Sequence, residues 1–201
     1  MDPPRFLVGR VPPIDAAARR RRGAATTSEE PPPLARRITR TDWRWDGEGH
    51  QDRWSHLFVV DVVHGTTPHQ VTAGDWGVAE IAWSPDGQRV AFAADPRPDA
   101  DLRLRSTIWA VTVDDDRRAE PREVLEAGFA GHPAYSPDGR WLAAIGVLDP
   151  DPLDDASPTI LVGPADGSAA PWALAPELDR PVGNWTDTDL NGWMVSSRPG
   201  P

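Results

Sequence analysis

The sequence AWSPDG at residues 82–87 returns as AYSPDG at residues 134–139, 52 positions further along the chain. Alternating apolar residues surround both copies: Ile81 and Trp83 precede the first, and Val90 and Phe92 follow it. A period of two indicates strands with one buried face. Repetition at this length is typical of β-propeller blades and related stacked arrays.

The repeated tetrapeptide has the composition of a tight hairpin turn. Proline presets φ near −65°, aspartate accepts hydrogen bonds from nearby backbone amides, and glycine supplies the positive φ that closes the turn. Each copy therefore predicts a hairpin between two antiparallel strands. The turn residues are Ser84, Pro85, Asp86 and Gly87 in the first copy and Ser136, Pro137, Asp138 and Gly139 in the second.

Other apolar segments recur at nearly the same distance from each turn. Leu57–Asp61 and Ile108–Val111 precede the two turns at nearly equal distances, and Ile160–Gly163 opens a third, more degenerate unit that retains an aromatic at Trp185. We predict an all-β fold: a partial β-propeller of about three four-stranded antiparallel blades, with repeats at about 55–94, 106–147 and 158–197. Residues 38–201 would form this propeller. Residues 1–37 would supply an edge strand at Arg5–Gly9 and a flexible connector rich in Arg and Pro.

Composition narrows the classes of function. The 201 residues contain 10 Trp and 23 Pro. The absence of Cys excludes disulfides, thiolate zinc sites and cysteine nucleophiles. The net charge is −10, and the basic residues concentrate in the first 40 positions. The remainder of the chain is strongly acidic, and this charge argues against nucleic acid and anionic membranes as its partners. Helical composition is confined to Asp15–Arg22 and Glu120–Ala127, neither of which has an amphipathic stripe.

No segment has the length of a membrane span or the pattern of a signal peptide, so a cytoplasmic location is expected. Three blades fall short of the four to eight that close a propeller ring. We therefore expect the chain to be part of a larger assembly or to associate with itself.

The segment from Leu34 to Val63, LARRITRTDWRWDGEGHQDRWSHLFVVDVV, resembles the propeller of bacterial prolyl-oligopeptidase-type serine peptidases. The acylaminoacyl-peptidase and dipeptidyl-peptidase branch is the most similar. The stretch Ile38–Gly49 carries the more specific part of this likeness. The Ser-Pro-Asp-Gly hairpins are also similar to TolB-type and WD40-like propeller repeats.

The resemblance implies a non-catalytic role. In that family the propeller covers an α/β-hydrolase domain and gates or docks peptide substrates for it. Catalysis there needs a serine on a Gly-x-Ser-x-Gly elbow, followed by Asp and His, and no such elbow occurs in this chain. We therefore assign no catalytic residue, no metal and no cofactor. The partners implied are an α/β-hydrolase domain and peptides.

A recognition site, if the chain has one, is predicted in the Asp46–Asp52 loop. Acidic groups, glycines and a histidine lie there beside Trp43, Trp45 and Trp54. Carboxylates facing a propeller channel could pair with the cationic N-terminus of a peptide. An exposed turn that serves only backbone geometry is the simpler alternative. The candidate residues are Asp46, Glu48, His50 and Asp52.

Other candidates are weaker. The acidic runs near Asp114 and Asp149 lack the glycine and glutamate that a calcium loop requires, so solvated loops are expected. His56 and His132 are interpreted as structural or surface residues. Two other functions stay open: a TolB-like propeller used for protein–protein interaction, and a truncated gene product without an independent role.

Overall fold

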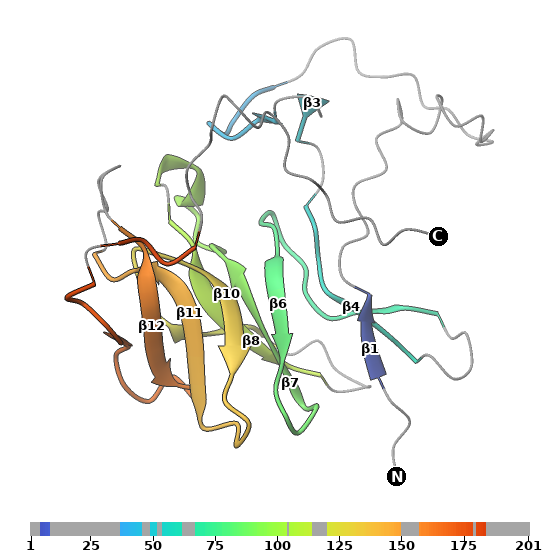
Figure 1. Cartoon of the computed structure of the whole chain (residues 1–201). Helices are drawn as coiled ribbons and strands as arrows, with labels where there is room; N and C mark the ends of the chain where they lie inside the picture. Colours follow the sequence, from blue (N-terminus) through green and yellow to red (C-terminus); the bar gives the residue numbers. More distant parts are fainter. Residues whose placement is uncertain are drawn as a thin grey trace, which may run out of the picture.

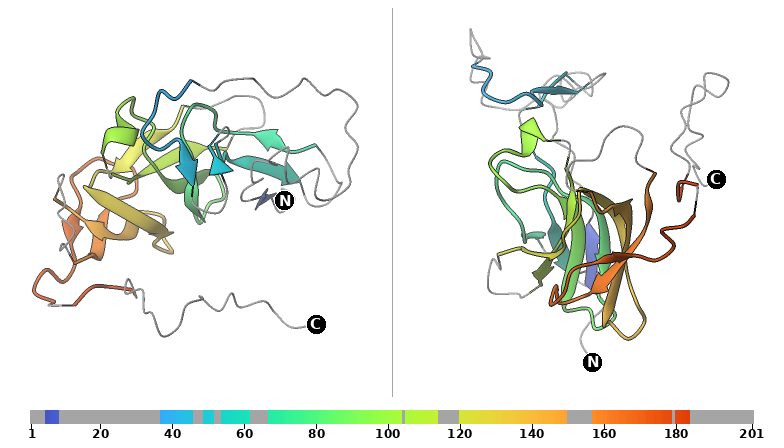
Figure 2. Two further views of the ribbon diagram at one scale, coloured as in Figure 1. Left: turned by 90° about the horizontal axis from the view of Figure 1, so that it is seen from above. Right: turned by 90° about the vertical axis from the view of Figure 1, so that its left-hand side faces the viewer.

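Antiparallel sheets, joined by tight hairpins, make up the computed structural model. It describes residues 5–8, 37–45, 49–51, 54–61, 67–103, 105–113, 120–149, 157–178 and 180–183. The predicted all-β partial propeller is confirmed: two four-stranded sheets and one three-stranded sheet follow one another along the chain. Figures 1 and 2 show them side by side, with the three-stranded sheet at one end.

The first four-stranded sheet contains β6 (Ala79–Trp83), β7 (Arg89–Ala94), β8 (Thr107–Thr112) and β9 (Arg122–Leu125) in that order. The second contains β10 (Phe129–Tyr135), β11 (Trp141–Val147), β12 (Thr159–Pro164) and β13 (Trp172–Ala173). The three-stranded sheet has the order β1 (Arg5–Val8), β4 (Phe58–Asp61) and β5 (His69–Gln70). A separate pair joins β2 (Arg44–Trp45) to β3 (Gly49–His50), and η1 (Ala100–Leu102) is a short 3-10 helix.

The two Ser-Pro-Asp-Gly hairpins have the same hydrogen bonds. In the β6–β7 turn the Gly87 N–H donates to the Ser84 carbonyl at 2.9 Å, and the Gln88 N–H donates to Asp86 Oδ1 at 3.0 Å. In the β10–β11 turn the Gly139 N–H donates to the Ser136 carbonyl at 2.9 Å. The glycine φ angles are 69° and 70°, which residues with a side chain rarely adopt. The conserved spacing of serine, aspartate and glycine in each turn therefore has a direct geometric cause.

A third turn of this kind joins β12 to β13, where the sequence reads Pro164-Ala-Asp-Gly. Its Gly167 has a φ of 67°, and its N–H donates to the Pro164 carbonyl at 2.9 Å. The Ser168 N–H donates to Asp166 Oδ1 at 3.0 Å, as the equivalent amide does in the other two turns. Sequence analysis missed this turn because it lies between the third and fourth strands of a sheet rather than between the first and second.

Each sequence repeat spans parts of two sheets. In the unit at about 55–94, β4 and β5 belong to the three-stranded sheet, whereas β6 and β7 open the next one. In the third unit, β12 and β13 complete the second four-stranded sheet. The hairpin expected after Trp185 lies outside the described residues, as do Asp15–Arg22 and most of the connector.

The core has two layers, one on each face of the β6–β9 sheet. Val90, Phe92 and Ala94 face Leu57 and its neighbours in the three-stranded sheet. The intervening residues of β7 face the second four-stranded sheet, so all of Val90–Ala94 is at most 5% exposed. Within Glu120–Ala127, which has helical composition, Arg122–Leu125 forms β9 instead because Val124 and Leu125 complete this second layer.

Candidate functional site on the first strands

The first strands of the two four-stranded sheets carry matching bulges. The pairing of β6 with β7 shifts between Ala79 and Ile81, and that of β10 with β11 shifts between Gly131 and Ala134. Each bulge contains one non-glycine residue of positive φ, 46° for Glu80 and 52° for His132. Such bulges redirect side chains and occur next to functional sites.

Glu80 and His132 lie 52 positions apart, the same spacing as the two hairpin turns. They are therefore equivalent residues of the repeat, although their side chains differ in charge. A left-handed conformation costs an L-residue about 1–2 kcal/mol. Because residues in such rare backbone conformations cluster at functional sites, two equivalent positions that both adopt one mark a candidate site.

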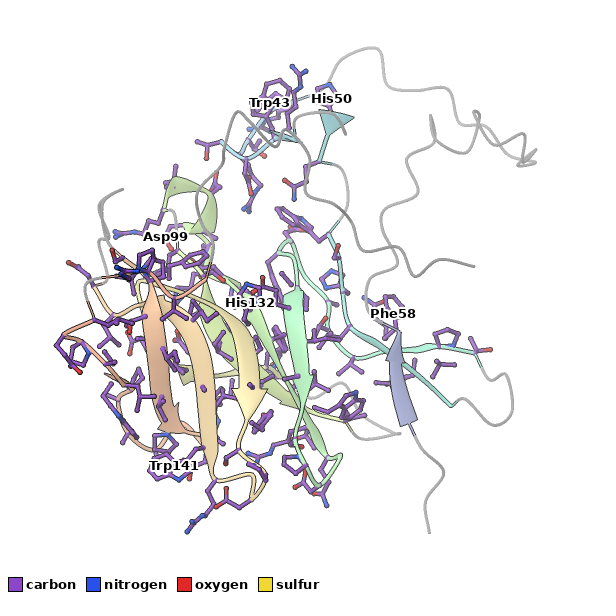
Figure 3. The ribbon with its side chains drawn as sticks, in the orientation of Figure 1. Trp43, His50, Phe58, Asp99, His132 and Trp141 are labelled. Atoms are coloured by element: carbon purple, nitrogen blue, oxygen red, sulfur yellow. The ribbon has the colours of Figure 1, made fainter. Side chains whose placement is uncertain are left out.

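The two bulged residues contact each other across the gap between the sheets. The His132 N–H donates to Glu80 Oε2 at 2.7 Å, and His132 Nε2 lies 3.2 Å from Glu80 Oε1. Figure 3 shows the labelled His132 between β6 and β10. The carboxylate thus links the first strands of two neighbouring sheets.

Gly131 makes this approach possible. A Cβ at that position would collide with Glu80 Oε2 and lie 3.4 Å from Glu80 Cδ. The three heavy atoms nearest to that Cβ position all belong to the Glu80 carboxyl. The glycine therefore leaves the space that the carboxylate occupies.

The pair remains accessible to solvent. The Glu80 side chain is 38% exposed and that of His132 is 56% exposed. Glu80 Oε2 is occupied by the backbone amide, while Oε1 has lone pairs that can accept further hydrogen bonds. This arrangement can bind an ammonium group or an amide N–H from a ligand that enters between the first strands.

The predicted recognition loop is only partly within the described residues. Asp46, Glu48 and Asp52 lie outside them, so their role stays a prediction. His50, in β3, is exposed and its ring centroid lies 5.2 Å from that of Trp43. Figure 3 shows this pair at one end of the molecule, well away from His132.

The segment that carries the family resemblance contacts the loop after β7. The Thr41 N–H donates to Asp101 Oδ2 at 2.8 Å, and the Thr41 hydroxyl donates to the Asp101 carbonyl. Arg40 bonds Asp42 at 2.8 Å through Nε, and its guanidinium lies 5.0 Å from the centre of a Trp54 ring. The bonds of Thr41 connect the residues before the propeller repeats to η1.

Sequence analysis did not indicate the ion cluster that the structure forms around Asp95, in the loop after β7. Asp95 is only 5% exposed, and it bonds Arg97 at 3.0 Å and Arg105 at 3.2 Å. Arg97 also reaches both oxygens of Glu123, at 2.6 and 2.7 Å. Burial by itself would lower the pKa of Arg97, but its hydrogen bonds to Glu123 and Asp95 raise it. The partner in β9 is 26 residues away, so no local pattern could have indicated it.

Both ring nitrogens of His56 have a polar neighbour within the fold. Its Nε2 lies 3.1 Å from the Gly74 carbonyl, and its Nδ1 lies 3.3 Å from the Thr72 hydroxyl, which accepts the Leu57 N–H. Burial lowers the pKa of His56, while the bond to Gly74 raises it by a smaller amount. These contacts agree with the interpretation of His56 as structural. For His132, the contact with Glu80 adds a role that the sequence did not indicate.

Among the described residues, no helix is long and apolar enough to cross a membrane. Nor do three or more His, Asp or Glu side chains of this part of the chain gather where a metal ion could bind.

No family model matches the chain. A curated relative, dipeptidyl-peptidase 5 of Porphyromonas gingivalis, is 28% identical over 113 residues, which is 48% of this chain and 16% of the relative. The match thus spans less than a fifth of that protein. It supports the resemblance to a peptidase-type propeller segment that the sequence indicated.

Two solved structures are also similar. TolB of Agrobacterium tumefaciens superposes with a TM-score of 0.47 and 20% identity, over 62% of this chain and 42% of that one. TolB of Acinetobacter baumannii has a TM-score of 0.40 and 12% identity, over 59% of this chain and 26% of that one.

Proposed function

We propose that this chain is a non-catalytic propeller segment that docks or gates peptide substrates for an α/β-hydrolase domain supplied elsewhere. The contact between Glu80 and His132 carries the proposal, together with the similarity to a dipeptidyl-peptidase. Propeller sheets are arranged around a channel, and the first strands β6 and β10 of these two sheets contact each other. A ligand in such a channel would therefore encounter this pair.

In the proposed role, Glu80 binds the cationic end of a peptide. Oε1 would accept a hydrogen bond from the ammonium group while Oε2 keeps its bond to the His132 amide at 2.7 Å. A charge-assisted bond of this kind is about twice as strong as a neutral one. The net charge of −10 would attract such a ligand from solution. A cytoplasmic location belongs to the same proposal, and the absence of cysteine is compatible with it.

Peptide binding to the 201-residue chain tests this role. Titration calorimetry or NMR would compare a short peptide that has a free N-terminus with its acetylated form. We expect the free amine to bind at least about tenfold more tightly, a difference equivalent to 1.4 kcal/mol. Equal affinities for the two peptides would contradict the assigned docking point.

A matched pair of variants locates the site. Glu80→Gln removes one negative charge and keeps the shape, so it should abolish the preference for the free amine. Glu126→Gln makes the same charge change at an exposed position beyond β9 and should retain the preference. A loss of preference in both variants would mean that overall charge, rather than this site, attracts the peptide.

A further inference from the structure

The two faces of the β6–β9 sheet are both covered within the chain. The three-stranded sheet packs on one face through Leu57 and Val59, and the β10–β13 sheet packs on the other through Leu142 and Leu161. We call the face of a sheet that the next sheet along the chain covers its leading face. The opposite face is its trailing face.

Among the described residues, the β10–β13 sheet has a covering sheet on its trailing face alone. Leu142, Ala144 and Leu161 are at most 2% exposed and belong to the core shared with β6–β9. The alternate residues of β11 and β12 point the other way, and strand register places them on one surface. Its leading face contains Trp141, Ala143, Ile145, Ile160, Val162 and Trp172.

The repeat shows that this leading face is built to be covered. At the same spacing of 52 positions, Ala143, Ile145, Ile160 and Val162 correspond to Ala91, Ala93, Ile108 and Ala110 of the β6–β9 sheet. Those four residues are 0%, 4%, 0% and 7% exposed because the next sheet lies on them. Their counterparts on the leading face are all partly exposed.

Two tryptophans enlarge the exposed apolar area at one end of this face. Trp141 is 41% exposed and Trp172 is 42% exposed, and their ring centroids are 5.4 Å apart in an edge-to-face arrangement. Contiguous apolar surface of this kind indicates an interaction site. Its chemistry suits another apolar sheet face rather than a charged ligand.

The opposite end of the described structure has an open trailing face. Leu57, which precedes β4, and Val59 of β4 point toward the core, at 2% and 8% exposure. Phe58 and Val60 alternate with them along β4 and are partly exposed. Figure 3 shows Phe58 and Trp141 at opposite sides of the molecule.

We propose that the leading face of one copy of this chain binds the trailing face of a second copy, head to tail. Both sheet contacts among the described residues join a leading face to a trailing face, and the two faces that these residues leave open are the unmatched halves of that contact. A second copy therefore extends an interface that already exists. Heterologous contacts of this kind produce closed rings or open chains of subunits.

Sedimentation velocity and light scattering of the full chain test the proposal. We expect the weight-average mass to rise above the monomer value of 21.9 kDa as concentration increases through the micromolar range. High salt should strengthen the association, since it screens the repulsion between chains of net charge −10 and leaves apolar contacts intact. A mass that stays at 21.9 kDa under all these conditions would overturn the proposal.

Two single variants distinguish head-to-tail contact from other arrangements. Val162→Lys alters the leading face and Val60→Lys alters the trailing face, so each should be monomeric alone. Mixed together they should form a dimer and stop, because each copy retains the face that the other lacks. Association of Val60→Lys alone would indicate leading faces that bind each other, and it would refute the head-to-tail contact.

Further variants guard against loss of folding. Trp172→Lys changes a more exposed residue of the leading face and should also prevent association. Leu102→Lys makes a similar apolar-to-charged change in η1, where the side chain is 72% exposed and lies on neither open face, and should associate like the original chain. If Trp172→Lys folds, as judged by circular dichroism, and still associates, the leading face is not the contact.

Discussion

Adding a methyl group at Gly131 should separate the two sheets at their first strands. The new Cβ would collide with Glu80 Oε2 and force the carboxylate away from the His132 N–H, which donates a hydrogen bond to Oε2 at 2.7 Å. A hydrogen bond to a charged group contributes about 1.5–3 kcal/mol when buried. Because Glu80 is 38% exposed and can be rehydrated, we expect a loss of about 1–2 kcal/mol.

Part of that loss is offset by the unfolded state. Alanine restricts the unfolded chain more than glycine and stabilises a compatible site by about 0.4–1 kcal/mol. Gly131→Ala should therefore destabilise the protein by a net amount of about 1 kcal/mol. Urea denaturation monitored by circular dichroism measures this difference in the free energy of unfolding.

Making the same substitution in the Glu80→Ala variant tests whether the cost comes from the Glu80 carboxylate. In Glu80→Ala the three atoms nearest to the new methyl group are gone, so Gly131→Ala should be neutral or stabilising there. The double-mutant cycle should give a coupling of about 1–2 kcal/mol between the two positions. An equal cost of Gly131→Ala in both backgrounds would refute the assigned contact.

Three further outcomes follow from the structure. Gly146→Ala should cost about 3 kcal/mol or more in the same denaturation assay, since its Cβ would collide with the backbone carbonyl of Phe129, which cannot rotate away. Burial lowers the pKa of His56 below its unfolded value of about 6.5. The contribution of His56 to stability should therefore be fully present above that pH and should decline as the pH falls through the folded pKa. The pH dependence of Tm should be smaller in His56→Gln. Arg97→Ala should destabilise the protein by about 1–3 kcal/mol, because it leaves Asp95, whose side chain is 5% exposed, with Arg105 as its one arginine partner. Arg97→Lys should cost less, because lysine loses only the paired bonds to Glu123. Unchanged melting temperatures in both variants would contradict this ranking.

Local patterns accounted for the repeating parts of the fold. The turn sequence around Pro85 specifies its own hydrogen bonds within six residues, and the alternation in β7 is visible without any partner. The strand at Arg5–Val8 was also indicated by a short apolar run. The assignment of strands to sheets was less accessible, because hairpin sequences do not show which of two neighbouring sheets a strand joins.

The candidate site depended on distant contacts. Nothing beside Glu80 in the sequence shows that its carboxylate reaches a backbone amide 52 residues away. Its left-handed φ was equally hidden, because glutamate is not a residue that signals a bulge. Comparison of the two repeats does align Glu80 with His132, and that alignment is the one signal that could have drawn attention to them.

The sequence by itself determined an all-β chain of repeated hairpins, because each turn and each alternating strand is stabilised by residues that are neighbours along the chain. Tertiary structure decided which faces are buried, where Glu80 meets His132, and that Asp95 lies among arginines rather than in solvent. The physical reason is the range of the interactions. Turn geometry acts over four residues, whereas sheet packing and buried charge depend on groups that only folding brings together.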